Sequence, residues 1–169
     1  LMTEPELAAE PALDIRPWGW DAALRKRLSG LGVDESLLPS MQQISVWREY
    51  SHRSKSVSLL PELQLDEHFC GESYYLKTPE EWKSFVEERE GCLLKAPLSG
   101  SGKGLNWCKG TFTPFISGWC TRVAALQGGV IAEPIYNKVE DFALEFYSDG
   151  AGEVTFVGYS LFRTGKSGM

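Results

Sequence analysis

Apolar residues recur at helical spacing in the first part of the chain. Leu24, Leu28 and Leu31 follow one another in steps of three or four residues, and Gly30 and Gly32 are typical of a helix end. Basic residues towards the C-terminal end of this segment complement the partial negative charge at the end of a helix. The pattern therefore predicts a short amphipathic helix.

A second helix is expected from about Met41 to the upper fifties. Ser40 and Gln43 have the spacing of a capping box, and Trp47 lies on the apolar face of the residues that follow. We expect Pro61 to close this helix, because proline has no backbone N–H to donate.

Ser51, His52 and Arg53 stand near the far end of this expected helix. A histidine beside an arginine can contact a substrate carboxylate, but a solvated or capping pair explains these residues better. We assign them no function from the sequence.

Two threonine–proline pairs predict further helix starts. Thr78 precedes Pro79 and has Glu81 three residues later, and Thr113 precedes Pro114. A glycine pair is expected to stop the second of these helices.

In the last part of the chain, apolar and polar residues alternate with a period of two. Strands are predicted at 130–132, 141–147 and 154–162, with a glycine-containing hairpin turn between the last two. Asp141 and Glu145 fall on the same face of the middle strand. Either a solvated face or a contact with ribose or a metal-bound nucleotide explains two carboxylates there.

These elements predict an α+β protein, in which a helical N-terminal region precedes an antiparallel-sheet subdomain. Residues 1–17, rich in proline, glutamate and alanine, are interpreted as a flexible arm. Residues 18–77 form the helical region and a linker, with a short edge strand at 74–76. Residues 78–169 form the strand-rich subdomain. The chain begins with leucine and ends directly after a strong strand, so we interpret it as a fragment.

The composition narrows the class of protein. Of the 169 residues, 43% are hydrophobic and 24% are charged, which is ordinary for a globular chain. The net charge of -6 argues against a nucleic-acid partner, which usually requires a basic face. No apolar run approaches the roughly 18 residues of a membrane span. We therefore expect a soluble, cytoplasmic protein without a membrane partner.

The four cysteines do not indicate a metal site. They contain no CxxC pair, and the chain has only two histidines. Cys92 and Cys120 fall at apolar positions and are predicted to be buried, reduced thiols.

A strand that carries a lysine and leads into a glycine-rich loop is the strongest candidate for a binding site. Cys92 to Leu94 form a short apolar run, and Lys95 adds a cation at its end. The loop that follows contains Ser99, Gly100, Ser101, Gly102, Lys103 and Gly104. Backbone N–H groups of such a loop can approach an anion closely, which predicts a grip for nucleotide phosphates. A mobile hairpin loop is the alternative.

Common phosphate-binding motifs do not fit this loop. A Walker A motif needs serine or threonine after its lysine, whereas Gly104 follows Lys103. The dinucleotide fingerprint needs a GxxG step, which alternating glycines do not provide. Protein kinases place the glycine loop before the lysine strand, whereas Lys95 precedes the loop.

The order of these features resembles the ATP-grasp family, and the resemblance spans most of residues 17–164. It is most specific for a bacterial group of ATP-grasp-domain proteins of uncertain substrate. The stretches that carry it are Pro17-Trp-Gly-Trp-Asp21, Ser51-His-Arg53, Leu94-Lys-Ala-Pro97, Glu133-Pro134, Asp141-Phe142 and Gly158-Tyr-Ser-Leu-Phe162.

The resemblance implies a role for each matched residue. It implies that Lys95 contacts the nucleotide phosphates and that the loop from Ser99 to Gly104 closes over them. It also implies Glu133 and Ile135 as the hinge that meets the adenine, and Asp141 as the contact with the ribose.

The resemblance further implies an activity for the full-length protein. ATP-grasp ligases activate a carboxylate as an acyl phosphate for attack by an amine or thiol, with ATP and magnesium. The magnesium ligands would lie after residue 169, so this chain alone is expected to be inactive. The sequence identifies neither substrate. A non-catalytic nucleotide-binding or interaction module is the alternative.

Overall fold

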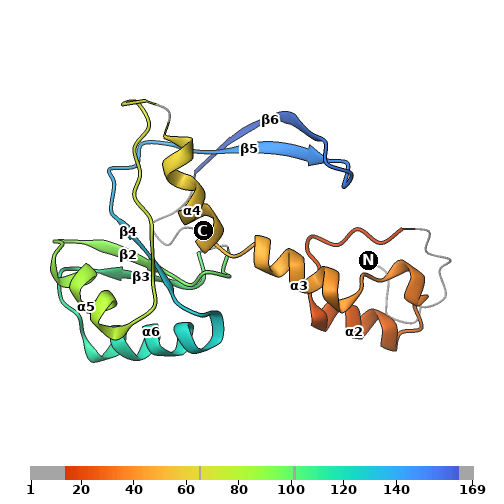
Figure 1. Ribbon diagram of the computed structural model, residues 1–169, viewed down its shortest axis with the longest axis horizontal. Coiled ribbons are helices and arrows are strands. Elements are labelled where there is room, and N and C mark those ends of the chain that lie inside the picture. The colour runs from red at the N-terminus through yellow and green to blue at the C-terminus, as the bar shows by residue number, and fades with distance from the viewer. Residues whose placement is uncertain (1–13, 65, 101, 164–169) are drawn as a thin grey trace. The chain divides into compact units, whose positions relative to one another are not determined.

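The computed structural model describes residues 14–64, 66–100 and 102–163 (Figure 1). The chain divides into two compact units between Lys55 and Ser56. Within the described residues of the first unit lie α2 (Ala22–Gly30), a short 3-10 helix η1 (Glu35–Leu37) and α3 (Met41–Tyr50).

Helix α2 confirms the first predicted helix. Asp21 is its N-cap, and the Leu24 N–H donates to Asp21 Oδ1 at 2.7 Å. Leu28 is the buried residue of the helix. Gly32, just after the helix, has a φ of 84°, which favours glycine and explains why the chain turns there.

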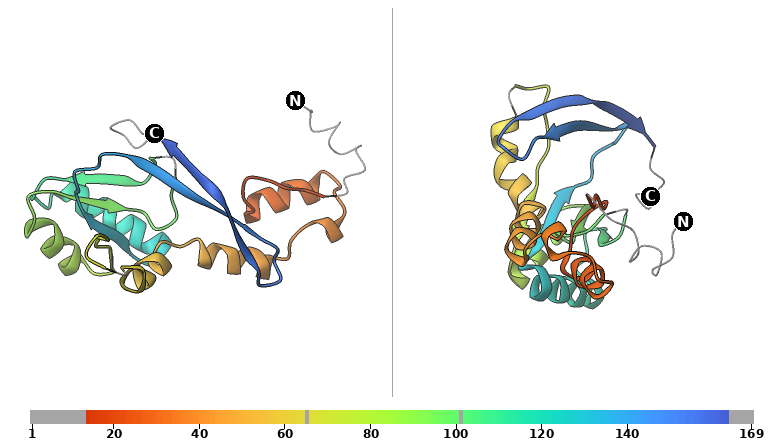
Figure 2. Two further views of the ribbon diagram at one scale, coloured as in Figure 1. Left: turned by 90° about the horizontal axis from the view of Figure 1, so that it is seen from above. Right: turned by 90° about the vertical axis from the view of Figure 1, so that its right-hand side faces the viewer.

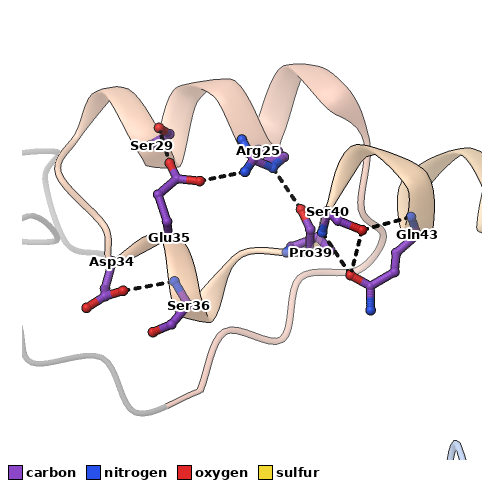
Figure 3. A network of polar contacts seen from close by, with 8 residues as sticks. All are labelled: Arg25, Ser29, Asp34, Glu35, Ser36, Pro39, Ser40 and Gln43. Carbon is purple, nitrogen blue, oxygen red and sulfur yellow. Dashed lines mark hydrogen bonds and ion pairs between the residues drawn. The ribbon is translucent and has the colours of Figure 1, made fainter.

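Polar side chains join α2 to the residues that lead into α3 (Figure 3). Arg25 donates to Glu35 Oε2 at 2.5 Å through Nη2 and to the Pro39 carbonyl at 2.7 Å through Nε. Ser29 Oγ donates to the other Glu35 oxygen at 2.5 Å. The hydrogen bonds from Ser29 and Arg25 hold the pKa of Glu35 below its ordinary value.

Helix α3 begins as predicted but does not reach the upper fifties. The capping box is present, with the Gln43 N–H donating to Ser40 Oγ at 3.1 Å. The helix ends at Tyr50, and a separate helix, α4 (Ser54–Leu63), follows and crosses the boundary between the units.

The break between α3 and α4 corrects the prediction of one long helix. His52 Nδ1 lies 2.7 Å from Ser54 Oγ, and the Ser54 N–H donates to the same nitrogen at 3.3 Å. Such local side-chain bonds compete with helical hydrogen bonds and favour a turn. The prediction that Pro61 closes the helix is also wrong, because Pro61 lies inside α4, which continues to Leu63.

The described part of the second unit contains a four-stranded antiparallel sheet in the order β1-β4-β2-β3. Its strands are β1 (Tyr74–Leu76), β2 (Cys92–Lys95), β3 (Leu105–Cys108) and β4 (Val130–Pro134). The predicted edge strand is β1. Strand β3 was not predicted, and it forms the opposite edge of the sheet.

Two helices connect these strands and lie on the same side of the sheet (Figure 1). Helix α5 (Pro79–Glu87) joins β1 to β2, and α6 (Pro114–Gln127) joins β3 to β4. Both predicted caps are confirmed: Thr78 Oγ1 and Thr113 Oγ1 each accept a backbone N–H at 3.3 Å. No helix within the described ranges is long and apolar enough to cross a bilayer.

The core of this unit lies between the sheet and its two helices. The members of this cluster are all buried, and they are Trp82, Phe85, Val86, Cys92, Leu94, Ala96, Cys108, Ile116, Cys120, Val123, Val130 and Ala132. Burial of apolar surface is the dominant stabilising contribution, at roughly 25 cal/mol per Å². Because Cys92 and Leu94 face this core, the intervening residues of β2 face the other side of the sheet.

The cysteines follow the predicted pattern. Cys92, Cys108 and Cys120 are buried and unbridged, whereas Cys70 is exposed. Burial raises the pKa of the Cys120 thiol to about 12. This thiol therefore stays protonated at neutral pH, and protonated, buried thiols are chemically inert.

Strands β5 (Asp141–Ser148) and β6 (Val154–Phe162) form a separate two-stranded sheet, which Figure 2 shows as a long twisted ribbon. They confirm the last two predicted strands. One face of the ribbon is apolar, and each of its large side chains is more than half exposed: Phe142, Leu144, Phe146, Val154, Phe156, Tyr159 and Leu161.

Candidate functional site

The sheet face opposite α5 and α6 carries the candidate site. Side chains alternate along a strand, so the residues next to the core positions belong to this second face. They are Tyr75 on β1, Leu93 and Lys95 on β2, Leu105 and Trp107 on β3, and Ile131 and Glu133 on β4. The two charged residues lie on the two central strands.

Lys95 and Glu133 form an ion pair on this face. Lys95 Nζ lies 2.5 Å from Glu133 Oε2, and the two side chains are only 22% and 26% exposed. Ser73 Oγ, just before β1, donates to Glu133 Oε1 at 3.3 Å. An ammonium group carries three donors, so its contact with Glu133 leaves Lys95 able to donate to an anion as well.

The glycine-rich loop leaves β2 and returns as β3 directly beside Lys95. The Ala96 N–H donates to the Gly104 carbonyl at 2.8 Å, which closes the base of the loop. Ser99 Oγ donates to the Ala96 carbonyl at 2.9 Å. Two predicted loop residues, Ser99 and Gly104, are therefore fixed next to the end of the lysine strand.

The tip of the loop is a turn. The Lys103 N–H donates to the Gly100 carbonyl at 3.0 Å, and Gly102 has a φ of 70°. Lys103 is exposed. The predicted residue Ser101 lies outside the described residues.

Gly104 is required at its position for two reasons. Its φ of 70° lies in the left-handed region, which other residues rarely adopt. A Cβ added there would also lie 2.8 Å from Ser99 Cβ and 3.0 Å from Ala96 Cβ. The loop can therefore pack this closely against the end of β2 only with glycine at this point.

Helix α6 anchors the first part of the loop. The Leu98 N–H donates to Gln127 Oε1, in the last turn of α6, at 2.7 Å. Tyr75 on β1 donates its hydroxyl to the Gln127 carbonyl at 3.3 Å. The start of the loop is thus fixed to the scaffold behind it.

The predicted hinge lies where β4 loses one neighbour. The ladder between β1 and β4 ends at Tyr74, opposite Ala132, whereas β2 continues to pair with Glu133 and Pro134. After Ala132, the backbone of β4 therefore pairs with β2 on one side and lies outside the β1–β4 ladder on the other. Ile135 follows directly and is 49% exposed.

Asp141 belongs to the two-stranded sheet rather than to the sheet that carries Lys95. It is the first residue of β5, and its Oδ2 accepts from Lys138 Nζ at 2.8 Å. Its register partner is Phe162, and Glu145 shares its face of the ribbon, as the alternation predicts. The structure thus joins Lys95, Glu133 and the glycine loop in one place, with Asp141 in a different sheet.

Trp107 is an exposed residue of this face that the sequence did not reveal. It lies opposite Leu93 on β3, and it is 51% exposed. The segment from Leu105 to Cys108 is short and has no clear alternation, so only its position after a glycine loop could have indicated a returning strand.

Within the residues that the structure describes, no group of three or more His, Cys, Asp or Glu side chains could hold a metal ion. Comparison of the chain with protein-family models, curated proteins and solved structures finds no match.

Proposed function

We propose that this chain binds the phosphates of ATP on the sheet face that carries Lys95 and Glu133. The observation that supports the proposal is a half-buried lysine at the end of a central strand, directly before a loop whose return requires glycine at Gly104. Backbone N–H groups of such a loop can surround an anion, while the ammonium group supplies the positive charge.

Each predicted residue has a place in this proposal. Lys95 donates to a phosphate oxygen, and the residues Ser99, Gly100, Ser101, Gly102, Lys103 and Gly104 cover the phosphates and exclude water. Glu133 and Ile135 form the hinge that meets the adenine, since one side of β4 lies outside the ladder there. Asp141 accepts hydrogen bonds from the ribose hydroxyls.

The reaction proposed for the full-length protein is ligation of a carboxylate to an amine or thiol through an acyl phosphate. Mg²⁺ would neutralise charge on the transferred phosphoryl group when it is bound.

Calorimetric titration tests the proposal directly. ATP and ADP are titrated into the protein with and without Mg²⁺, and into the Lys95→Met variant, which keeps the stem of the side chain and removes its charge. The affinity for ATP should fall about tenfold or more in this variant. Lys83→Met is the matched control, because Lys83 is exposed on α5, which packs on the other face of the sheet.

The outcomes separate the possible roles of Lys95. Unchanged affinity in Lys95→Met would make the lysine purely structural, and no binding of ATP by the unmodified chain would overturn the proposal. Binding of ATP without ADP formation by the full-length protein, across carboxylate and amine or thiol candidates, would favour the non-catalytic module over a ligase.

A further inference from the structure

We propose that Trp107 is the stacking platform for the base of the bound nucleotide. This inference rests on the proposed function, and it assigns a base-binding role to a residue of β3 outside the glycine loop and the hinge. It specifies the ligand class as nucleotides whose aromatic base lies flat on an indole ring.

The register places Trp107 in one row with the predicted hinge. Leu93 on β2 lies opposite Trp107 on one side and opposite Glu133 on the other. Neighbouring strands are about 4.8 Å apart, so Trp107 and Glu133 lie about 10 Å from each other across the sheet, with Leu93 between them. The row therefore offers an indole, an aliphatic side chain and a carboxylate on one face.

The phosphate grip lies beside this row, two residues further along β2 from Leu93. Lys95 is opposite Leu105, the residue that follows Gly104, and Trp107 lies two residues further along β3. Two residues of a strand span about 7 Å. A nucleotide with its phosphates at Lys95 and the loop would thus place its base over Leu93 and Trp107.

The packing of Trp107 fits this role better than a role in the core. The residues of the core cluster lie between the sheet and its helices, and Cys108, the neighbour of Trp107, is one of them. Trp107 belongs to the other face, and 51% of its surface is exposed although it stands in a strand. A tryptophan fixed by a strand loses little conformational freedom when a base stacks on it.

Titration with and without a base tests the inference. The affinities of ATP and of inorganic tripolyphosphate are measured for the unmodified chain and for Trp107→Ala, Trp107→Phe and Trp47→Ala. Trp47 is the matched control, since it is 42% exposed on α3. Trp107→Ala should weaken the affinity for ATP about 5- to 150-fold and leave the affinity for tripolyphosphate unchanged. Trp107→Phe should retain most of the affinity for ATP, and Trp47→Ala all of it.

The outcomes distinguish this inference from the function on which it rests. If the unmodified chain binds ATP and Trp107→Ala binds it equally well, the stacking role is overturned and the phosphate site stands. If Trp107→Ala weakens the affinities for ATP and for tripolyphosphate by the same factor, Trp107 supports the fold of the sheet and does not bind the base. If the unmodified chain binds neither ligand, the proposed function and this inference both fail.

Discussion

Lys95 and Glu133 meet diagonally across the two central strands of the sheet. In the register of β2 and β4, Lys95 lies opposite Ile131, and Glu133 lies opposite Leu93. The two charged residues are therefore two positions apart along the strands, a distance of about 7 Å that the long lysine stem can bridge. Their contact at 2.5 Å thus depends on the pairing of β2 with β4.

This geometry predicts energetic coupling between the two charges. Lys95→Met and Glu133→Gln should each lower the free energy of unfolding by about 1–2 kcal/mol, because each leaves a half-buried charge without its partner. The double variant should lose about 1 kcal/mol less than the sum of the two. Urea unfolding of all four proteins gives the coupling energy, and strict additivity would show that the pair contributes nothing.

Two glycines of the glycine-rich loop, Gly100 and Gly104, should respond differently to alanine. Gly104→Ala should lower the free energy of unfolding by about 2 kcal/mol, because the left-handed backbone and the contacts of the new Cβ with Ser99 and Ala96 are both unfavourable. Gly100→Ala is the control, since its Cβ would meet no atom within 4 Å, and it should change stability by less than about 0.5 kcal/mol. Equal effects in thermal unfolding would contradict the tight return at Gly104.

Helix starts were predictable from the sequence because their signals are local. Thr78 and Thr113 each accept a hydrogen bond from the backbone N–H three residues later. Each cap therefore forms within the same short segment that shows the sequence pattern. The prediction of one long helix from Met41 was wrong because the signal that ends this helix is not part of the hydrophobic pattern. The turn at His52 depends on the geometry of one side chain with Ser54, which no hydrophobic period records.

The candidate site was only partly predictable, because strand pairing is not local. Lys95 and the loop were recognised from adjacent residues, and Glu133 was selected as a hinge through the family resemblance. Its ion pair with Lys95 requires β2 and β4 to be neighbours, which the sequence does not state. Trp107 was missed because the strand that carries it is too short to show a period.

The threonine caps should contribute to stability and not to nucleotide affinity. Thr78→Ala and Thr113→Ala should each lower the free energy of unfolding by about 1 kcal/mol, since each removes the acceptor for a backbone N–H. The serine variants keep this acceptor and should remain near the original stability. Chemical denaturation measures both effects, and a cap variant with normal stability but weakened ATP binding would contradict a purely structural role.

The proposed contact of Asp141 with ribose can be separated from its contact with Lys138. Two hydroxyls of a ribose can donate to one carboxylate, whereas a 2′-deoxyribose leaves one acceptor unfilled. Lys138 Nζ already lies 2.8 Å from Asp141 Oδ2, so loss of that ion pair must be distinguished from loss of a sugar contact. The variant Lys138→Met removes the ion pair and keeps the carboxylate.

Asp141→Asn should therefore weaken the affinity for ATP more than the affinity for dATP. The ratio of the two affinities should then fall towards one. Lys138→Met should keep the original ratio, and so should Glu145→Gln, which changes a carboxylate on the same face of β5. Titrations of both nucleotides into the three variants measure the ratio. If Asp141→Asn lowers the affinities for ATP and dATP equally, the role of Asp141 is reduced to its ion pair with Lys138 at the start of β5. A carboxylate that does not contact the sugar cannot distinguish the two nucleotides, because they differ only in the 2′-hydroxyl.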